Sequence, residues 1–447
     1  MVRRAAVSLI LLIAWTDLSR AWDLRQPPTS TDRAAVLAAG WTASRESLTN
    51  ALLAAYRPGG PLRPGSTGVT AYRAWMLLWK WCDLLSRSPR EEAARHLANH
   101  LRVSRQEKKL IFFGPGYLPN LADGRIEAAQ ASLILSDHPA AGEFLRRLLP
   151  PDLADPPDKS IAEDVDSTIL AEWINDPELS RLLFDNLSDD DYWPGVVQRL
   201  QELRRANARK FTEYRALAVA LALVYDQAFP GFWPHRQVDP EKVPTVPMPV
   251  AFWFNFWIES NESQALIFDL RRLSPSEIKY IVDAPLDPSE FRWARKNAKY
   301  QRSDLAKAFD AVSYSQERIG SERFRWEGAD YTLQSIRLQG GICVDQAYYA
   351  AIVGKARGFP TLFFTGQGSQ GGHAWFGYLK GENRWELDCG RYKYQNYAIG
   401  EALDPQTWLP ISDHQLNLYA NGLRDPLAYF ASEDDILIGR LSESAGD

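Results

Sequence analysis

The chain has 447 residues, of which 45% are hydrophobic and 24% are charged, and its formal net charge is −5 at pH 7. This length and apolar content suffice for two or three domains with buried cores. The mildly acidic balance excludes a general electrostatic attraction for nucleic acid, and three cysteines are too few for a disulfide framework.

The N-terminus has the pattern of a secretory signal peptide. An arginine pair precedes an apolar run over residues 5–15, and Ser19 and Ala21 are the small residues of a cleavage site. The apolar run is too short to span a bilayer. We therefore predict that residues 1–21 are removed and that the mature protein is secreted or periplasmic, with no transmembrane anchor after cleavage.

Helical patterns dominate the chain as far as Val312. Apolar residues return at three- and four-residue spacing in several segments, which include residues 31–56, 72–85, 161–173, 177–184, 196–207 and 211–227. Residues 88–91, Ser-Pro-Arg-Glu, form a capping box with proline at the first helical position. Residues 150–159 are rich in proline and aspartate and are the predicted linker. We therefore expect two helical domains, residues 22–150 and 160–312.

Aromatic residues crowd together within residues 252–257 of the second helical region. Such a cluster can form a face that stacks on sugars, which would let the helical half recognise glycans. Buried packing is the commoner use of large aromatic side chains. We expect buried packing here and keep glycan recognition as an alternative.

The most informative stretch spans residues 330–407. Two glycines precede Cys343, and small residues return at helical spacing after it, so the cysteine should begin a helix with a closely packed face. A thiol at a helix N-terminus meets unpaired N–H groups and the positive end of the helix dipole, which lowers its pKa. Cys343 is therefore a candidate nucleophile, the alternative being a core cysteine.

Beyond this helix the apolar spacing changes from helical to alternating. Residues 360–365 and 373–379 are predicted strands separated by a glycine-rich loop, and a turn at residues 380–383 precedes a further strand over residues 384–389. The last two strands are therefore expected to form an antiparallel hairpin.

The hairpin register decides whether His373 and Asp388 share a face. With Lys380 and Gly381 as a two-residue loop, His373 lies opposite Asp388. With all four turn residues in the loop, Asp388 lies opposite Trp375, on the face that His373 shares. A three-residue loop would place the two groups on opposite faces.

Cys343, His373 and Asp388 thus supply a nucleophile, a general base and an orienting acid, as thiol acyl-transfer chemistry requires. Glu386 lies two residues before Asp388 on the same strand face and is the alternative acid. The non-catalytic alternatives are that His373 is an ordinary histidine in a strand and that Asp388 is an ordinary surface aspartate.

Three ordered motifs in this stretch resemble those of the transglutaminase-like superfamily, which has a papain-like core. Residues 341–347 (GICVDQA) resemble its cysteine motif, residues 372–375 (GHAW) its histidine motif and residues 385–388 (WELD) its aspartate motif. The resemblance covers about residues 330–407. It implies an α+β domain with an antiparallel sheet over residues 320–432, thiol acyl-transfer or amide hydrolysis, and neither a metal nor another cofactor.

The resulting expectation is an extracytoplasmic cysteine hydrolase that cleaves amide bonds through a thioester. Its substrate would be a protein or peptide, a cell-envelope component being one candidate. The backbone N–H of Cys343 and the side chain of Gln339 are the expected oxyanion donors. Trp375 and Tyr392 are candidates for the substrate groove, and Tyr392 could instead cover the sheet.

Two other functions remain open for the same residues. A transamidating cross-linking enzyme would use the same triad with an amine as acceptor, and a non-catalytic binding or scaffold protein could retain the fold without turnover. Whether Cys82 and Cys389 form a disulfide cannot be decided from their positions in the sequence.

Overall fold

The computed structural model describes residues 22–55, 67–103, 110–112, 124–125, 159–368, 371–391 and 399–421. The predicted signal peptide, residues 1–21, and nearly all of the predicted linker, residues 150–158, lie outside these ranges. Within them, every helix is too short or too polar to cross a bilayer. The described residues belong to two compact units.

The first unit contains described residues of segments 22–92 and 159–187 and is helical. The helix predicted over residues 31–56 is interrupted at Gly40, whose φ of +87° ends one helix before the next begins. Trp81 lies in its core, where it stacks on Trp173 and donates to the Ser180 hydroxyl at 2.9 Å. Its helices are α2 (Ser30–Ala39), α3 (Trp41–Ala55), α4 (Thr67–Ser86), η2 (Ile161–Asp164), α8 (Ser167–Ile174) and α9 (Pro177–Phe184), together with the first residues of α5 (Pro89–His100).

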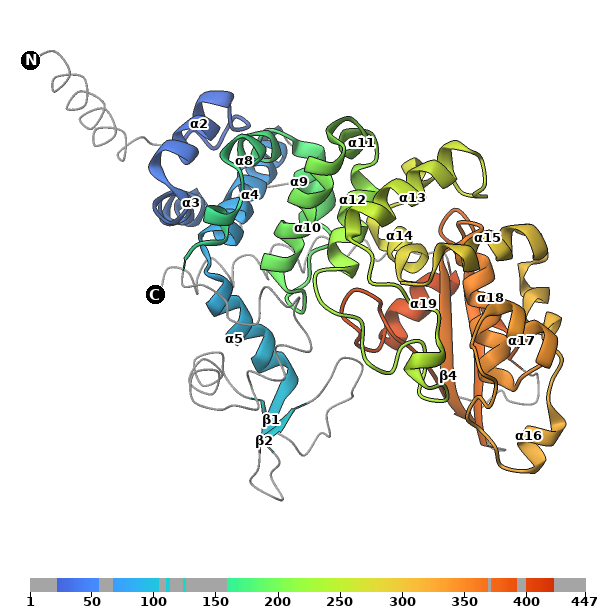
Figure 1. Cartoon of the computed structure of the whole chain (residues 1–447). Helices are drawn as coiled ribbons and strands as arrows, with labels where there is room; N and C mark the ends of the chain where they lie inside the picture. The colour runs from blue at the N-terminus through green and yellow to red at the C-terminus, as the bar shows by residue number, and fades with distance from the viewer. Residues whose placement is uncertain are drawn as a thin grey trace, which may run out of the picture. The chain divides into compact units, whose positions relative to one another are not determined.

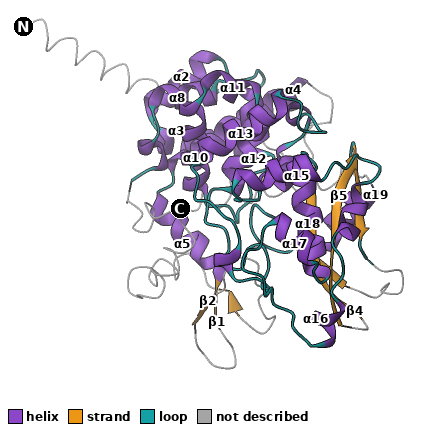
Figure 2. Ribbon diagram, turned by 45° about the vertical axis from the view of Figure 1, so that its right-hand side comes forward, coloured by secondary structure: helices purple, strands orange, loops and turns teal. Residues whose placement is uncertain are grey.

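The second unit contains the described residues of segments 93–125 and 188–421. Its larger helices are α10 (Trp193–Ala206), α11 (Ala208–Glu213), α12 (Arg215–Val224), α13 (Val250–Glu262), α14 (Pro275–Val282), α15 (Pro288–Asn297), α16 (Gln316–Gly320), α17 (Leu333–Gln339), α18 (Cys343–Ala356) and α19 (Asp413–Asn421). Short 3₁₀ turns lie between them, at η3 (Pro240–Lys242), η4 (Leu270–Arg272) and η5 (Leu305–Ala311). Figure 2 shows α18 beside strand β5 of the same unit.

The aromatic residues of α13 serve as core. Trp253, Phe254 and Trp257 are buried, and the rings of Trp253 and Trp257 meet Phe291 of α15 at centroid distances of 6.1 and 5.4 Å. These edge-to-face contacts stabilise the packing beyond the burial of apolar area. The prediction that this cluster is buried is therefore confirmed, and the packing lies within one unit.

Two antiparallel sheets lie in the second unit. The smaller has the order β2-β1-β3, with β1 at Leu101–Val103, β2 at Leu110–Phe112 and β3 at Gly124–Arg125. The larger has the order β6-β5-β4-β7, formed by β4 (Thr361–Gly368), β5 (Gly371–Gly381), β6 (Arg384–Cys389) and β7 (Ile399–Ala402). The mixture of helices and antiparallel sheets is compatible with the predicted α+β class, although the smaller sheet lies within residues 22–150, which were expected to be helical.

Helix α18 packs closely on the larger sheet (Figure 1). The Thr361 hydroxyl donates to the carbonyl of Ala351 at 3.0 Å, and a Cβ on Gly354 would lie only 2.5 Å from the Thr361 methyl. A larger side chain at Gly354 would therefore force the helix away from β4. The face of small residues that was predicted after Cys343 is therefore the face of α18 that packs on β4.

The unit boundaries differ from the expected domains. Residues 188–312 belong to the same unit as α18 and the larger sheet, instead of forming part of a separate helical domain. The ammonium of Lys355 on α18 bonds the Tyr280 carbonyl at 2.7 Å and the Asp283 carboxylate at 2.6 Å, both at α14. These bonds join α14 to α18 within the second unit.

All three cysteines are free thiols, so Cys82 and Cys389 are not paired. Both are buried, whereas Cys343 is partly exposed.

Candidate functional site

A tight glycine turn sets the start of α18. Gly340 has φ of +76°, and a Cβ there would lie 2.6 Å from the carbonyl oxygen of Ser313. The backbone N–H of Gly341 donates to that same oxygen at 2.9 Å, and the Ser315 N–H donates to the Gly341 carbonyl at 2.7 Å. Only glycine accommodates this approach at Gly340. The turn places Cys343 at the first residue of the helix.

The buried side chain of Asp345 stabilises the same turn. Its carboxylate accepts bonds from the Ile342 N–H at 2.8 Å, from the Arg318 guanidinium at 2.7 Å and from the Tyr331 hydroxyl at 2.9 Å. The Tyr331 hydroxyl also lies 2.8 Å from Nε2 of His235, whose burial lowers its pKa to about 3. His235 is therefore a neutral member of the network at neutral pH.

Sequence reasoning missed this network, although Asp345 occupies the third helical position, where a carboxylate can cap the chain. The other members of the network, Arg318, Tyr331 and His235, are distant from Asp345 in the sequence, and no local sequence pattern marks them.

Burial raises the pKa of the Cys343 thiol. The backbone N–H groups of Ala374, Val344 and Cys343 itself lower it by a smaller amount, and burial prevails. The expectation of a lowered pKa at this helix terminus is thus not met. The resting sulfur is a thiol, and it depends on a nearby base to become a nucleophile.

His373 lies on β5 directly before Ala374, whose N–H approaches the Cys343 sulfur. Its Nε2 is 2.9 Å from the carbonyl oxygen of Gly390. A carbonyl can only accept, so Nε2 carries the proton and Nδ1 presents a lone pair in the neutral ring. Burial lowers the pKa of His373, which favours that neutral form at neutral pH.

The observed hairpin turn differs from both expected ones. Glu382 and Asn383 form a two-residue turn, and Asn383 has the left-handed φ of 51° that asparagine tolerates. The turn therefore falls later than a loop at Lys380 and Gly381 would place it. Two register irregularities interrupt the pairing of β5 with β6.

This register separates Asp388 from His373. Phe376 pairs with Cys389, so Asp388 lies level with Gly377, four residues along β5 from His373. At about 3.3 Å per residue that is roughly 13 Å, beyond the reach of a hydrogen bond. The two residues share a strand face, as expected, but the structure does not bring them together.

The carboxylate of Asp388 has a different partner. Its side chain is 69% exposed and pairs with Arg391 at 3.0 Å. The alternative acid, Glu386, pairs with Lys380 at 2.7 Å and lies opposite Tyr378. The Gly390 carbonyl therefore occupies the place at His373 that the sequence assigned to an acid.

Two of the remaining predicted site residues, Gln339 and Trp375, do not line the pocket. Gln339 is exposed at the end of α17 and is not among the residues that line the pocket. Trp375 is buried, stacks on Phe364 with centroids 5.4 Å apart, and donates its indole N–H to the carbonyl of Leu387, so it belongs to the core. Tyr392 lies outside the described residues.

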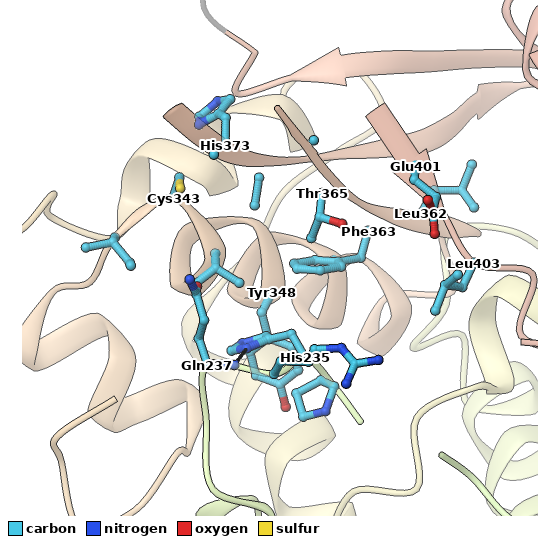
Figure 3. Close-up of a pocket in the computed structure, with 18 of the residues that line it drawn as sticks. His235, Gln237, Cys343, Tyr348, Leu362, Phe363, Thr365, His373, Glu401 and Leu403 are labelled. Carbon is cyan, nitrogen blue, oxygen red and sulfur yellow. Dashed lines mark hydrogen bonds between the residues drawn. The ribbon is translucent and has the colours of Figure 1, made fainter. Parts of the chain in front are cut away.

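Cys343 and His373 both line a pocket of about 840 Å³ in the second unit. Figure 3 shows them at one end, with the Gln237 side chain extending toward Cys343 from the opposite wall. The half-buried Gln237 follows His235, whose Nδ1 accepts the Gln237 backbone N–H at 3.3 Å. Gln237 was not predicted, because it lies more than a hundred residues before the cysteine motif and no local pattern marks it.

In the part of the chain that the structure describes, no group of three or more His, Cys, Asp or Glu side chains is arranged to hold a metal ion. A scan against protein-family models, a search of curated proteins and a search of solved structures each found no match.

Proposed function

We propose that this protein is a cysteine-dependent acyl-transfer enzyme that hydrolyses peptide or side-chain amide bonds through a thioester. The observation that carries the proposal is that Cys343 begins α18 and lines one large pocket together with His373 of β5. The resemblance of the three sequence motifs to the transglutaminase-like superfamily supports it. The signal pattern in residues 1–21 suggests that the enzyme acts outside the cytoplasm.

In the proposed reaction, Nδ1 of His373 takes the proton of the Cys343 thiol as the sulfur attacks the substrate carbonyl. The carbon–sulfur bond forms, the carbonyl π electrons move to oxygen, and a tetrahedral oxyanion results. When the carbon–nitrogen bond breaks, the leaving nitrogen takes the proton from His373. Water then attacks the thioester, with His373 as base, and releases the acid and the thiol.

Two groups are suited to stabilise the oxyanion. The backbone N–H of Cys343 stands at the start of α18, where it has no helical acceptor, and the Gln237 amide faces the same end of the pocket. Gln237 replaces Gln339 in this proposed role. Substituting Gln237 should lower turnover far more than it lowers protein stability.

The test is iodoacetamide labelling of the mature chain, followed by peptide mapping. The sulfur displaces iodide, so a carbon–sulfur bond forms while the carbon–iodine bond breaks. Cys343 should react, and Cys82 and Cys389 serve as internal buried controls. His373→Gln should slow the reaction at Cys343 by at least about 10-fold. Labelling of Cys343 at the same rate in both proteins would contradict the proposal.

One observation favours a second candidate, a binding or scaffold protein with little turnover. The raised pKa of Cys343 leaves little thiolate at neutral pH. On that alternative, His373→Gln would leave labelling unchanged and no acyl adduct would form with an activated ester. If acyl adducts do form, a labelled amine offered in competition with water distinguishes transamidation from hydrolysis.

A further inference from the structure

The larger sheet contributes one face to the pocket. Thr361 on β4 bonds Ala351 of α18, so alternate residues Phe363 and Thr365 project to that same side. Thr365 pairs with Ala374 on β5 and with Glu401 on β7. Ala374, Thr365 and Glu401 thus form one row across three neighbouring strands, and all three line the pocket.

This row gives the distance from Glu401 to the end of the pocket where Cys343 lies. Neighbouring strands lie about 4.8 Å apart, so the backbone of Glu401 is roughly 10 Å from that of Ala374, whose N–H group lowers the pKa of the Cys343 thiol. Figure 3 shows Cys343 and His373 at one end of the pocket and Glu401 with Leu403 at the other. A distance of 10 Å equals about three residues of extended chain.

The wall between the two ends is largely apolar. The ring of Phe363 lies between them, and His235, a neutral group, stacks on Phe363 with centroids 5.8 Å apart. Tyr348 also lines the pocket. A substrate that follows this wall buries a hydrophobic spacer there.

Glu401 is half-buried at the end of this path. Among the described residues its carboxylate has neither a hydrogen bond nor an ion pair, and burial raises its pKa. A carboxylate that loses water without gaining a partner is under-solvated, and a cation would relieve this cost.

The cations that share the pocket lining are engaged elsewhere. Lys355 is bonded to Asp283 at 2.6 Å and to the carbonyl of Thr361 at 3.0 Å. The guanidinium of Arg236 stacks on the ring of Phe232 at 4.5 Å. Neither of these two cations forms an ion pair with Glu401.

We propose that Glu401 selects amide substrates that carry a cationic group, such as an ammonium, about 10 Å from the scissile carbonyl across an apolar spacer. A basic side chain or a free amino group of a short peptide meets this description. The inference rests on the proposed function for its chemistry, since it places the scissile carbonyl at Cys343. The binding preference itself does not require turnover.

The test measures binding by calorimetry in the Cys343→Ala variant, which separates recognition from reaction. The probes are N-aminohexyl acetamide, N-hexyl acetamide and N-carboxypentyl acetamide, which share an amide and a spacer and differ in end charge. The aminohexyl probe should bind about 3- to 10-fold more tightly than the hexyl probe, as for a partly exposed ion pair, and the carboxypentyl probe most weakly.

Two further variants sharpen the result. Glu401→Gln is nearly isosteric and should remove the preference for the ammonium, while Glu401→Lys should favour the carboxylate probe; melting temperatures would confirm that both fold. An unchanged order of affinities in Glu401→Gln, or no binding of the aminohexyl probe, would overturn the inference. Failure of the proposed function would instead appear as unreactive Cys343 toward iodoacetamide, whatever the binding preference.

Discussion

The Nε2 atom of His373 lies 2.9 Å from the carbonyl oxygen of Gly390. This bond fixes the tautomer and orientation of the imidazole, which is the function that an acid performs in a Cys-His-Asp triad. A carbonyl has no net charge, so it stabilises an imidazolium less than a carboxylate does. The pair of Cys343 and His373 is therefore expected to rest in its neutral form and to transfer the proton during attack.

Replacing Asp388 should have little effect on the reactivity of Cys343. The carboxylate is exposed and pairs with Arg391, and such surface pairs contribute about 0–1 kcal/mol. Asp388→Asn should therefore change the alkylation rate of Cys343 by less than about 3-fold. The rate is measured by quenching the alkylation at successive times and quantifying labelled Cys343 by mass spectrometry. A loss as large as that of His373→Gln would mean that Asp388 does orient the ring.

Gly390→Ala should destabilise the protein and slow the reaction. The residue has φ of +89°, and a Cβ there would lie 2.4 Å from the Phe309 ring. The strain should cost about 1–3 kcal/mol of unfolding free energy and displace the carbonyl that holds His373. Urea denaturation measures the first effect. Gly381→Ala, with no atom within 4 Å of its Cβ position, is the matched control; equal stability of the two variants would contradict this account.

Tyr331→Phe should weaken the start of α18. Its hydroxyl joins Asp345 at 2.9 Å to His235 at 2.8 Å, and its removal leaves two buried groups short of a partner. The expected loss is about 1–3 kcal/mol in unfolding free energy. Tyr349→Phe removes a buried-ring hydroxyl whose contact to Arg337 is 3.5 Å, and should cost less. If both variants lose the same unfolding free energy, the hydrogen bonds of Tyr331 to Asp345 and His235 do not stabilise the start of α18 as proposed.

The pH dependence of alkylation reports the state of the resting pair. Burial raises the pKa of Cys343 and lowers the pKa of His373, so thiol and neutral imidazole coexist at neutral pH. The rate should thus keep rising with pH through the usual thiol pKa of 9.0. A resting thiolate–imidazolium pair would instead give a rate that reaches a plateau below about pH 7.

The separation of Asp388 from His373 shows where sequence reasoning stops. The helix that begins at Cys343 and the strand that bears His373 could both be predicted, because two glycines and a change of apolar spacing are local signals. The register of β6 could not, since it depends on a turn at Glu382 and Asn383 and on local irregularities in pairing. Each residue of register shift moves a side chain about 3.3 Å along its strand.

The pocket residues that come from segments distant from Cys343 could not be predicted from the sequence either. Gln237 and His235 reach the pocket from a segment that the sequence assigned to a separate helical domain. Glu401 enters the pocket only because β7 pairs with β4. Such contacts arise from tertiary packing, which leaves no periodic signal at the residues concerned.

The central claim is that Cys343 accepts an acyl group with the help of His373. The most direct measurement is peptide mass mapping after brief exposure of the protein to an activated ester, which reports thioester formation. We predict an acyl group on Cys343 that is lost on longer incubation, and little or none in His373→Gln. Acylation that spares Cys343, or an adduct that forms equally well without His373, would contradict the account.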